Sequence, residues 1–296
     1  VCFCAFSRQT VDCAVLEVGM GGRLDATNMV RPLISVVTPV AFDHEAMLGN
    51  SLVKIAYEKA GIIKRQGLTV SALQRGVVRD VLVKIAKRRC NDIHFVRPQA
   101  KEKRLWVQTA PLLGSHQYEN AYLACKVLAL LRTRHGFARI PVNALSELTS
   151  QSFCIPGRLE CVAKKPRVFV DGAHNAAAID ASLTTIVAYA RERSVVLVFG
   201  LCNDKSIERI VPVLKKYSFP TVVTQGFSPR ARSAASIAGH CAHDGMLVEP
   251  MPRIKDALRC GREYAGTRGI VLVIGSFYLV SAVKRLIELE NKRTQR

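Results

Sequence analysis

Two polar residues in the first fifty positions follow hydrophobic runs, where a bound metal ion could be held. Glu17 stands near the end of the run at 12–18, and His44 follows the run at 33–39. If both runs are parallel strands, their carboxyl ends share one edge of a sheet, which is where ligands gather in open α/β folds. A carboxylate offers Mg²⁺ a hard oxygen ligand, and an imidazole can join it. Glu17 and His44 are therefore candidate ligands of one ion, although either residue alone is more often an ordinary surface group.

A glycine-rich stretch and a lysine accompany these two residues. Gly19, Gly21 and Gly22 follow the first run and permit tight turns and a close approach of the backbone to a ligand. Lys59 lies in the amphipathic stretch at 52–63, where its position alone indicates a cation on a helix surface. Each of these signals is weak by itself, because glycine turns after strands and lysines on helices are common.

Runs rich in Val, Ile and Leu alternate with amphipathic stretches along the whole chain, as is typical of parallel sheets covered by helices. The sequence therefore predicts an α/β fold. The dipeptide Pro156-Gly157 interrupts both periodicities and is a strong turn signal, so we expect one domain at 1–153 and a second, smaller one at 154–296. The expected strands are 12–18, 33–39, 68–73, 94–96, 168–171, 195–200, 221–224 and 270–275. The expected helices are 52–63, 77–89, 117–132, 178–191, 207–216, 233–240 and 254–264.

The composition excludes several classes of protein. Of the 296 residues, 49% are hydrophobic and 22% are charged, which excludes a disordered chain and a collagen-like repeat. No uncharged run reaches the ~20 apolar residues that a membrane span needs, so we expect no membrane partner. The ten cysteines lack paired CxxC spacing and indicate reduced thiols of a cytoplasmic protein.

The chain is strongly basic. Lys and Arg number 43 against 23 acidic residues, a formal net charge of +20 that attracts anionic partners of any kind. Basic residues gather at 84–89, 97–104 and 284–296, with few aromatic residues between them for base stacking. Nucleic-acid binding therefore rests on charge alone, and we expect no specific nucleic-acid partner.

Several motifs follow one another along the chain, and together they form a much more specific signal than any one of them. They are E-V-G-x-G-G-R-L-D-A-T-N from Glu17, D-H-x-x-x-L-G from Asp43 and I-A-x-E-K-A-G-I-I-K from Ile55, followed by blocks at 114–121, 156–160, 170–175, 204–205 and 275–279. The chain closely resembles the folylpolyglutamate synthase and dihydrofolate synthase family, within the ATP-dependent Mur ligase superfamily. Each motif alone is modest, but their shared order along the chain makes chance agreement negligible. The resemblance implies a partial central ATPase domain followed by a Rossmann-like C-terminal glutamate ligase domain.

The resemblance also assigns roles to single residues. Glu17 and His44 match magnesium ligands, and Lys59 matches a lysine that is carbamylated to place a carboxylate near the metal. The lysine at position 64 falls outside that E-K-A-G position and is not expected to be functional. The implied nucleotide contacts are Asn120, Arg158 and Asp171, the implied catalytic residues are Lys59, Arg158 and His174, and the implied pterin-pocket residues are Arg23, Leu24 and Asp25.

The implied reaction joins an acid to an amino acid. A folate or dihydropteroate carboxylate attacks the γ-phosphate of ATP, and the amine of L-glutamate then attacks the acyl phosphate, so that phosphate departs as an amide forms. Mg²⁺ and Arg158 would stabilise the charge on the phosphate oxygens. We therefore expect ATP and Mg²⁺ as cofactors, small-molecule substrates and a monomer, located in the cytoplasm or, in a eukaryote, in mitochondria.

One part of the family pattern is missing from these 296 residues. The phosphate-binding segment G-x-x-G-K-[ST] belongs upstream of Glu17, and the residues before Glu17 do not contain it. The stretch at 200–206 imitates its end but lacks a glycine before Lys205 and lies in the second domain. We therefore expect this chain by itself to be inactive. The alternative is a protein that keeps the fold as a non-catalytic binding or regulatory protein.

Overall fold

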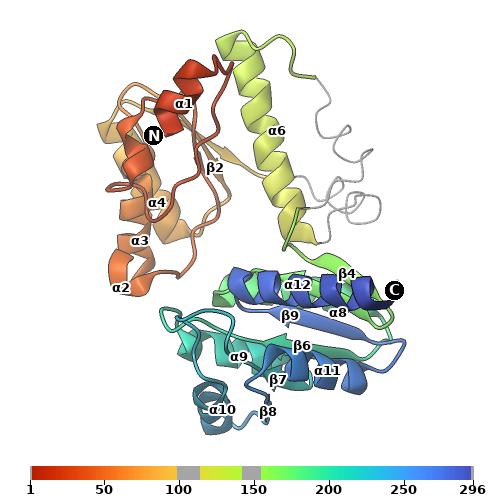
Figure 1. Cartoon of the computed structure of the whole chain (residues 1–296). Coiled ribbons are helices and arrows are strands. Elements are labelled where there is room, and N and C mark those ends of the chain that lie inside the picture. Colours follow the sequence, from red (N-terminus) through yellow and green to blue (C-terminus); the bar gives the residue numbers. More distant parts are fainter. Residues whose placement is uncertain (1, 99–113, 142–154, 295–296) are drawn as a thin grey trace.

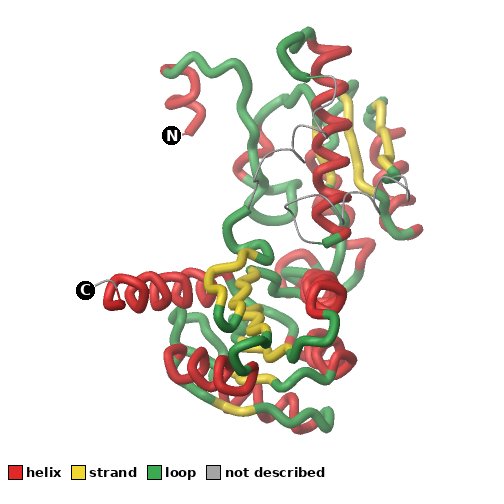
Figure 2. The backbone as a smooth tube through the Cα atoms, turned by 90° about the vertical axis from the view of Figure 1, so that its right-hand side faces the viewer, coloured by secondary structure: helices red, strands yellow, loops and turns green. Residues whose placement is uncertain are grey.

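The computed structural model describes residues 2–98, 114–141 and 155–294. They form a first lobe (2–98 and 114–141) and a second lobe (155–294), which lie one above the other, each with its own sheet and helices (Figures 1 and 2). In the described residues the first lobe has a three-stranded sheet and the second lobe a six-stranded sheet. This arrangement confirms the α/β fold class.

The first-lobe sheet is parallel and has helices on both faces. The apolar side chains of β1, α3 and α4 pack into one core, which includes Ile55 and Leu82. Val70 and Leu123 belong to a second core, formed where α6 packs on β2. The strands, in sheet order, are β1 (Ser35–Val37), β2 (Leu68–Ala72) and β3 (Asp92–Val96). The helices are α1 (Cys2–Arg8), η1 (Ala26–Met29), α2 (Glu45–Leu48), α3 (Leu52–Lys59), η2 (Ala60–Ile62), α4 (Gly76–Arg88) and α6 (Ser115–His135).

The second-lobe sheet is parallel except for β4, which pairs antiparallel with β5. Its central strands are continuous apolar runs because helices cover both faces. The strands, in sheet order, are β4 (Glu160–Lys164), β5 (Arg167–Asp171), β9 (Ile270–Ile274), β6 (Val195–Phe199), β7 (Thr221–Val223) and β8 (Glu249–Pro250). One face carries α8 (Ala176–Ala190), α9 (Ile207–Tyr217) and α10 (Ala234–His243), and the other carries α11 (Ile254–Ala265) and α12 (Phe277–Thr294).

The order of these strands sets the position of a ligand crevice. The last strand, β9, lies beside β5, and the chain leaves β5 towards α8 on one face of the sheet but leaves β9 towards α12 on the other face. Such a switch point opens a crevice at the carboxyl ends of the strands. The turns that follow Asp171, Phe199 and Ile274 meet there.

One predicted strand is wrong and some elements are missing from the prediction. Residues 12–18 are irregular and largely exposed, because no described strand pairs with them and an apolar run becomes a strand only beside a partner. The short strands β4 and β8 and the helix α12 are absent from the sequence-based prediction. The expected domain boundary at 153/154 falls outside the described residues, so it stays a prediction. In the described part of the chain, no helix is both long and apolar enough to cross a membrane.

Candidate functional site

Asp171 ends β5 at the crevice and organises the turns around it. Its side chain is buried and accepts hydrogen bonds from the backbone amides of Leu159 (3.1 Å) and Ala173 (2.8 Å) and from the hydroxyl of Ser182 (3.1 Å). Burial raises the pKa of Asp171, and these bonds and the nearby charge of Arg158 offset part of that rise. The carboxylate therefore holds the turn before β4 against the turn after β5.

Arg158 and Phe277 stand together beside that carboxylate. The Arg158 guanidinium carbon lies 4.6 Å from the centroid of the Phe277 ring, and the arginine is exposed. The ring sits in a space that only glycine leaves open, because a Cβ at Gly172 would lie 2.4 Å from Phe277 atoms and one at Gly157 would lie 3.2 Å away. An exposed cation and an aromatic ring at a strand switch point suit a nucleotide.

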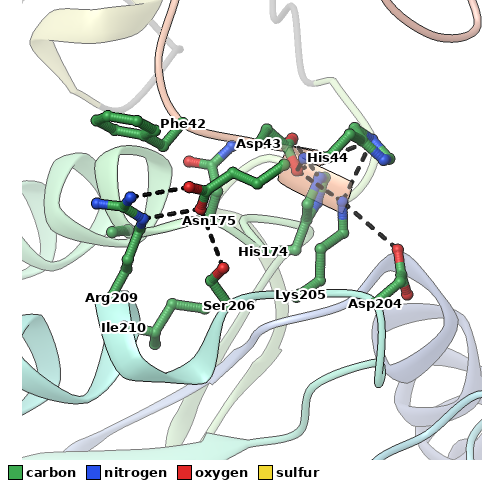
Figure 3. Close-up of a pocket in the computed structure, with 12 residues that line it drawn as sticks. Phe42, Asp43, His44, His174, Asn175, Asp204, Lys205, Ser206, Arg209 and Ile210 are labelled. Atoms are coloured by element: carbon green, nitrogen blue, oxygen red, sulfur yellow. Dashed lines mark hydrogen bonds and ion pairs between the residues drawn. The ribbon is translucent and has the colours of Figure 1, made fainter. Parts of the chain in front are cut away.

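Asp43 links the two lobes. It lies between β1 and α2, at the end of the first lobe that faces the second, and accepts a hydrogen bond from Lys205 Nζ (2.8 Å) and one from Asn175 Nδ2 (3.2 Å). The imidazole Nε2 of His174 lies 3.4 Å from Asp43 Oδ2 (Figure 3). Burial alone would raise the pKa of Asp43, but its bonds to His174 and Lys205 outweigh burial and hold that pKa well below its usual range. Asp43 therefore stays ionised among second-lobe donors.

His44 and His174 lie on the two sides of this contact. Burial lowers the pKa of His44, which favours a neutral imidazole, and its Nε2 lies 3.3 Å from Lys205 Nζ, which can only donate to it. Nδ1 of His174 lies 2.8 Å from the carbonyl oxygen of Gly172, which fixes the orientation of its ring. Figure 3 shows both histidines directed at the same cleft, which Asp43, Asp204 and Lys205 also line.

The glycine-rich stretch packs on the end of α3, where Lys59 is located. A Cβ at Gly22 would lie 3.0 Å from the carbonyl oxygen of Lys59, and one at Gly61 would lie 2.2 Å from the Arg23 Cα atom. The Arg23 amide donates to the Glu58 carbonyl oxygen (2.8 Å), and the Arg23 side chain pairs with the Glu58 carboxylate (3.0 Å). These close approaches explain why glycine stands at positions 22 and 61.

The three predicted pterin-pocket residues have different surroundings on this loop. The Arg23 side chain is paired as described, whereas Leu24 is 80% exposed and presents an apolar surface. Asp25 caps η1 by accepting bonds from the Thr27 amide (2.9 Å) and the Thr27 hydroxyl (2.6 Å). Of these three residues, Arg23 and Asp25 are engaged with neighbouring side chains, whereas the Leu24 side chain is largely exposed.

Lys59 has the environment of a reactive amine. Burial lowers the pKa of Lys59, and the charge of Asp43 offsets only part of that effect. A lowered pKa increases the neutral fraction, which is the form that attacks carbon dioxide to give a carbamate. Lysines shift in this way when they are desolvated.

The residues predicted to hold metal and nucleotide are only partly brought together. Glu17 is exposed in the irregular segment, and no group of three or more His, Cys, Asp or Glu side chains within the described ranges could hold a metal ion. Mg²⁺ commonly takes one or two carboxylates, several waters and phosphate oxygens, so a neutral His44 and an exposed carboxylate still fit it as partial ligands. Asn120 is exposed on α6 in the first lobe, while Arg158 and Asp171 are neighbours in the second.

Asp43, Asn175 and Lys205 are site residues that the residue assignments omitted. Asp43 precedes His44 in the D-H motif, and Lys205 ends the D-K block, so both stood inside recognised motifs. Their pairing across the cleft joins positions 162 residues apart, which motif spacing does not reveal.

Known proteins with similar sequences are folylpolyglutamate synthases and dihydrofolate synthases. The family model described as "Mur ligase, glutamate ligase domain" matches residues 157–277. The dihydrofolate synthase/folylpolyglutamate synthase of Bacillus subtilis is 28% identical over 299 residues, covering 94% of this chain and 68% of that protein. Its counterpart in Mycobacterium tuberculosis is 33% identical, over 80% of this chain and 53% of that protein.

Solved structures show the same fold. Folylpolyglutamate synthase of Mycobacterium tuberculosis, complexed with ADP and AMPPCP, superimposes with a TM-score of 0.81 at 28% identity, covering 96% of this chain and 70% of that one. Escherichia coli FolC in complex with DHPP and ADP gives a TM-score of 0.80 at 26% identity, covering 97% of this chain and 69% of that one. The chain thus spans about two thirds of the length of these solved relatives.

Proposed function

Because the chain belongs to the folylpolyglutamate synthase and dihydrofolate synthase family of ATP-dependent ligases, we propose that it takes part in joining L-glutamate to the carboxylate of a folate or of dihydropteroate. The observation that carries this proposal is the cleft where Asp43 and His44 of the first lobe meet His174 and Lys205 of the second. Phosphoryl transfer needs positive charge around crowded oxygens, and the Lys205 ammonium lies in this cleft beside the imidazoles of His44 and His174.

The nucleotide is proposed to bind beside Phe277, with Asn120, Arg158 and Asp171 as its contacts. The exposed guanidinium of Arg158 is the cation nearest the ring, and relatives of this chain have been solved with ADP. Asp171 already accepts bonds from two amides and a hydroxyl, so part of its role is to place the turn that carries Arg158.

The acid substrate is proposed to bind at the loop that carries Arg23, Leu24 and Asp25. The exposed apolar surface of Leu24 suits a flat aromatic ring. The loop packs on the end of α3, so a substrate held there lies near Lys59. We propose that Lys59 is carbamylated, which would turn a half-buried amine into an anion.

The reaction follows from these positions. The substrate carboxylate attacks the γ-phosphorus of ATP and ADP leaves, and the amine of glutamate then attacks the acyl carbon, so that phosphate leaves and the amine loses a proton. Arg158 and Lys205 provide positive charge for the phosphate oxygens, and His174, which lines the cleft with Lys205, is the further proposed catalytic residue. Mg²⁺, with Glu17 and His44 as proposed ligands, would supply further charge neutralisation when bound.

The 296-residue chain by itself is proposed not to turn over, because no G-x-x-G-K-[ST] segment occurs in its sequence. Such a segment supplies backbone amides and a lysine to the β- and γ-phosphates.

Calorimetric titration of ADP into the purified chain tests the nucleotide proposal. Arg158→Ala should weaken ADP binding about tenfold or more, because it removes the guanidinium that accompanies Phe277. Arg193→Ala is the matched control, since Arg193 is exposed and precedes β6 at the opposite edge of the sheet. Equal binding by the Arg158→Ala variant and the unaltered chain would contradict the proposed site.

A further inference from the structure

Glu45 and Arg209 form a second contact between the lobes, and neither residue is a specified position of any motif. Glu45 opens α2 in the first lobe, and Arg209 lies on α9 in the second. The guanidinium donates from Nε to one carboxylate oxygen (2.7 Å) and from Nη2 to the other (2.8 Å), and the Ser206 hydroxyl adds a third bond (3.0 Å). Dashed lines in Figure 3 mark these bonds from Arg209 and Ser206. Paired bonds of this kind fix direction as well as distance.

Phe42 holds the other side of the guanidinium. The Arg209 guanidinium carbon lies 3.9 Å from the centroid of the Phe42 ring. The Glu45 side chain is 17% exposed and that of Arg209 is 42% exposed, so water screens the pair only in part. Stacking on an aromatic ring together with a planar bidentate pair is specific to arginine, because lysine has neither the fork nor the flat face.

The position of this contact along the chain gives it its significance. Phe42 precedes Asp43 and Glu45 follows His44 in the sequence. Arg209 therefore contacts both ends of the turn that carries Asp43 and His44. His44 has φ 51°, in the left-handed region that a residue with a side chain adopts only where its surroundings hold it. We call the contacting group of Phe42, Glu45, Ser206 and Arg209 the clamp. Its contacts help to hold this backbone conformation.

We propose that Glu45 and Arg209 are positioning residues that fix the Asp43–His44 turn against the second lobe. The part of this inference that concerns turnover rests on the proposed ligase function, whereas the part that concerns the turn stands on the contacts alone. Glu45 occupies an unspecified position of D-H-x-x-x-L-G, and Arg209 lies beyond the D-K block. The motifs therefore assign no role to either residue of this pair.

Hydrogen–deuterium exchange of the peptide covering 42–49 tests the clamp without any catalysis. The Leu48 and Gly49 amides donate to the His44 and Glu45 carbonyl oxygens, so their exchange reports whether the turn stays in place. Arg209→Ala should speed exchange of this peptide about fivefold or more, while strands β5, β6 and β9 keep their protection. Lys216→Ala is the control, because its partner Asp180 lies in the same lobe.

A double-mutant comparison decides whether the two residues act as a unit. Glu45→Gln keeps the shape and an acceptor for Ser206 but removes the charge, so Glu45→Gln combined with Arg209→Ala should exchange no faster than Arg209→Ala alone. If the double variant instead exchanges faster than Arg209→Ala by the factor that Glu45→Gln produces alone, the proposal is overturned. Unchanged exchange in Arg209→Ala, or the same acceleration in Lys216→Ala, would overturn it as well.

Kinetics separate this proposal from the proposed function. In a form of the protein that releases ADP in a glutamate-dependent way, Arg209→Ala should lower kcat about tenfold and leave the KM for ATP within about twofold, because the clamp contacts none of the proposed nucleotide residues. An unchanged kcat, or a rise in KM alone, would overturn the role in turnover. If no form of the protein ligates glutamate, the proposed function fails, and the exchange experiment still decides whether the clamp exists.

Discussion

Asp43 receives donors from three side chains of the second lobe, and its chemistry explains why the lobes meet where they do. Its partners Lys205, Asn175 and His174 come from the loops after β5 and β6, at the edge where the crevice opens. A carboxylate with several donors stays ionised even when partly buried. The Asp43 carboxylate also accepts a hydrogen bond from the His44 amide (2.9 Å), which holds His44 in a defined position.

Asp43→Asn should destabilise the protein by about 1–3 kcal/mol, because the Lys205 side chain is only 10% exposed and would keep just the more distant Asp204 carboxylate (3.8 Å) as a charged partner among the described residues. Urea unfolding measures this loss. Asp180→Asn, which removes the partner of a Lys216 side chain that is 62% exposed, should change the free energy of unfolding by less than about 0.5 kcal/mol. Equal effects of the two substitutions would contradict the importance of the interlobe pair.

Lys59→Ala should abolish most glutamate-dependent ADP release in a competent form of the protein, and added short carboxylates should restore part of it, because they replace the carbamate. Lys54→Ala, an exposed position on the same helix, should leave the rate unchanged. Mass spectrometry of the intact protein under carbon dioxide checks the modification directly. Absence of rescue together with an unmodified Lys59 would count against carbamylation.

The expectation that Lys64 has no role in the reaction gains a structural reason. Its Nζ donates to the backbone oxygen (2.5 Å) and side-chain oxygen (2.8 Å) of Asn28, so it ties the end of η1 to the segment after η2. Lys64→Ala is therefore expected to act on stability and not on chemistry.

At the scale of elements, the glycine-rich loop and the end of α3 form one unit. The Gly22 backbone lies against the last carbonyl groups of α3, and Gly61 lies against the Arg23 backbone. This packing places the loop that is proposed to bind the pterin next to Lys59, although the two are far apart in the sequence. The closeness depends on two residues that have no side chain.

Gly61→Ala should push the Arg23 segment away from α3, because the added methyl group would lie 2.2 Å from a backbone atom that cannot rotate aside. Overpacking of this kind costs about 1–3 kcal/mol. Thermal unfolding followed by circular dichroism measures that cost. Gly76→Ala is the control, because a Cβ there meets nothing within 4 Å and alanine favours the first turn of α4. A Gly61→Ala variant as stable as the Gly76→Ala variant would refute this packing argument.

At the scale of the whole molecule, the cleft is a property of two lobes and not of either one. Its lining comes from residues 42–45 on one side and from 174–176 and 204–210 on the other. The net charge of +20 gives the molecule a field that attracts small anions, and all the proposed substrates are anions.

The purified 296-residue chain should bind ADP yet show no glutamate-dependent ADP release, whereas a version extended to include a G-x-x-G-K-[ST] segment should turn over. Removing one preorganised oxyanion donor typically costs ~10²–10³ in rate, and that segment supplies several. Coupled-assay measurement of ADP with folate and with dihydropteroate as acceptors compares the two versions and identifies the acid substrate. Comparable turnover by the short chain would show that its other residues suffice.

The sequence by itself determined the fold class, most strands and helices and the resemblance to the ligase family. Local periodicity is enough for this, since a buried parallel strand such as 270–274 is a continuous apolar run and α9 shows a clear apolar face. Ordered motifs also singled out His44, Lys59 and Arg158 as candidates. The same reasoning failed at 12–18, because an apolar run says nothing about whether another strand lies beside it.

Only the tertiary structure decided which side chains meet. Asp43 and Lys205 are 162 residues apart, and Glu45 and Arg209 are 164 apart, so no local pattern links either pair. Their contacts arise because the loops after strands of two different sheets meet at a common cleft. Sequence periodicity reflects the burial of each element against its own sheet, whereas the contacts between lobes depend on the summed geometry of all the elements between them.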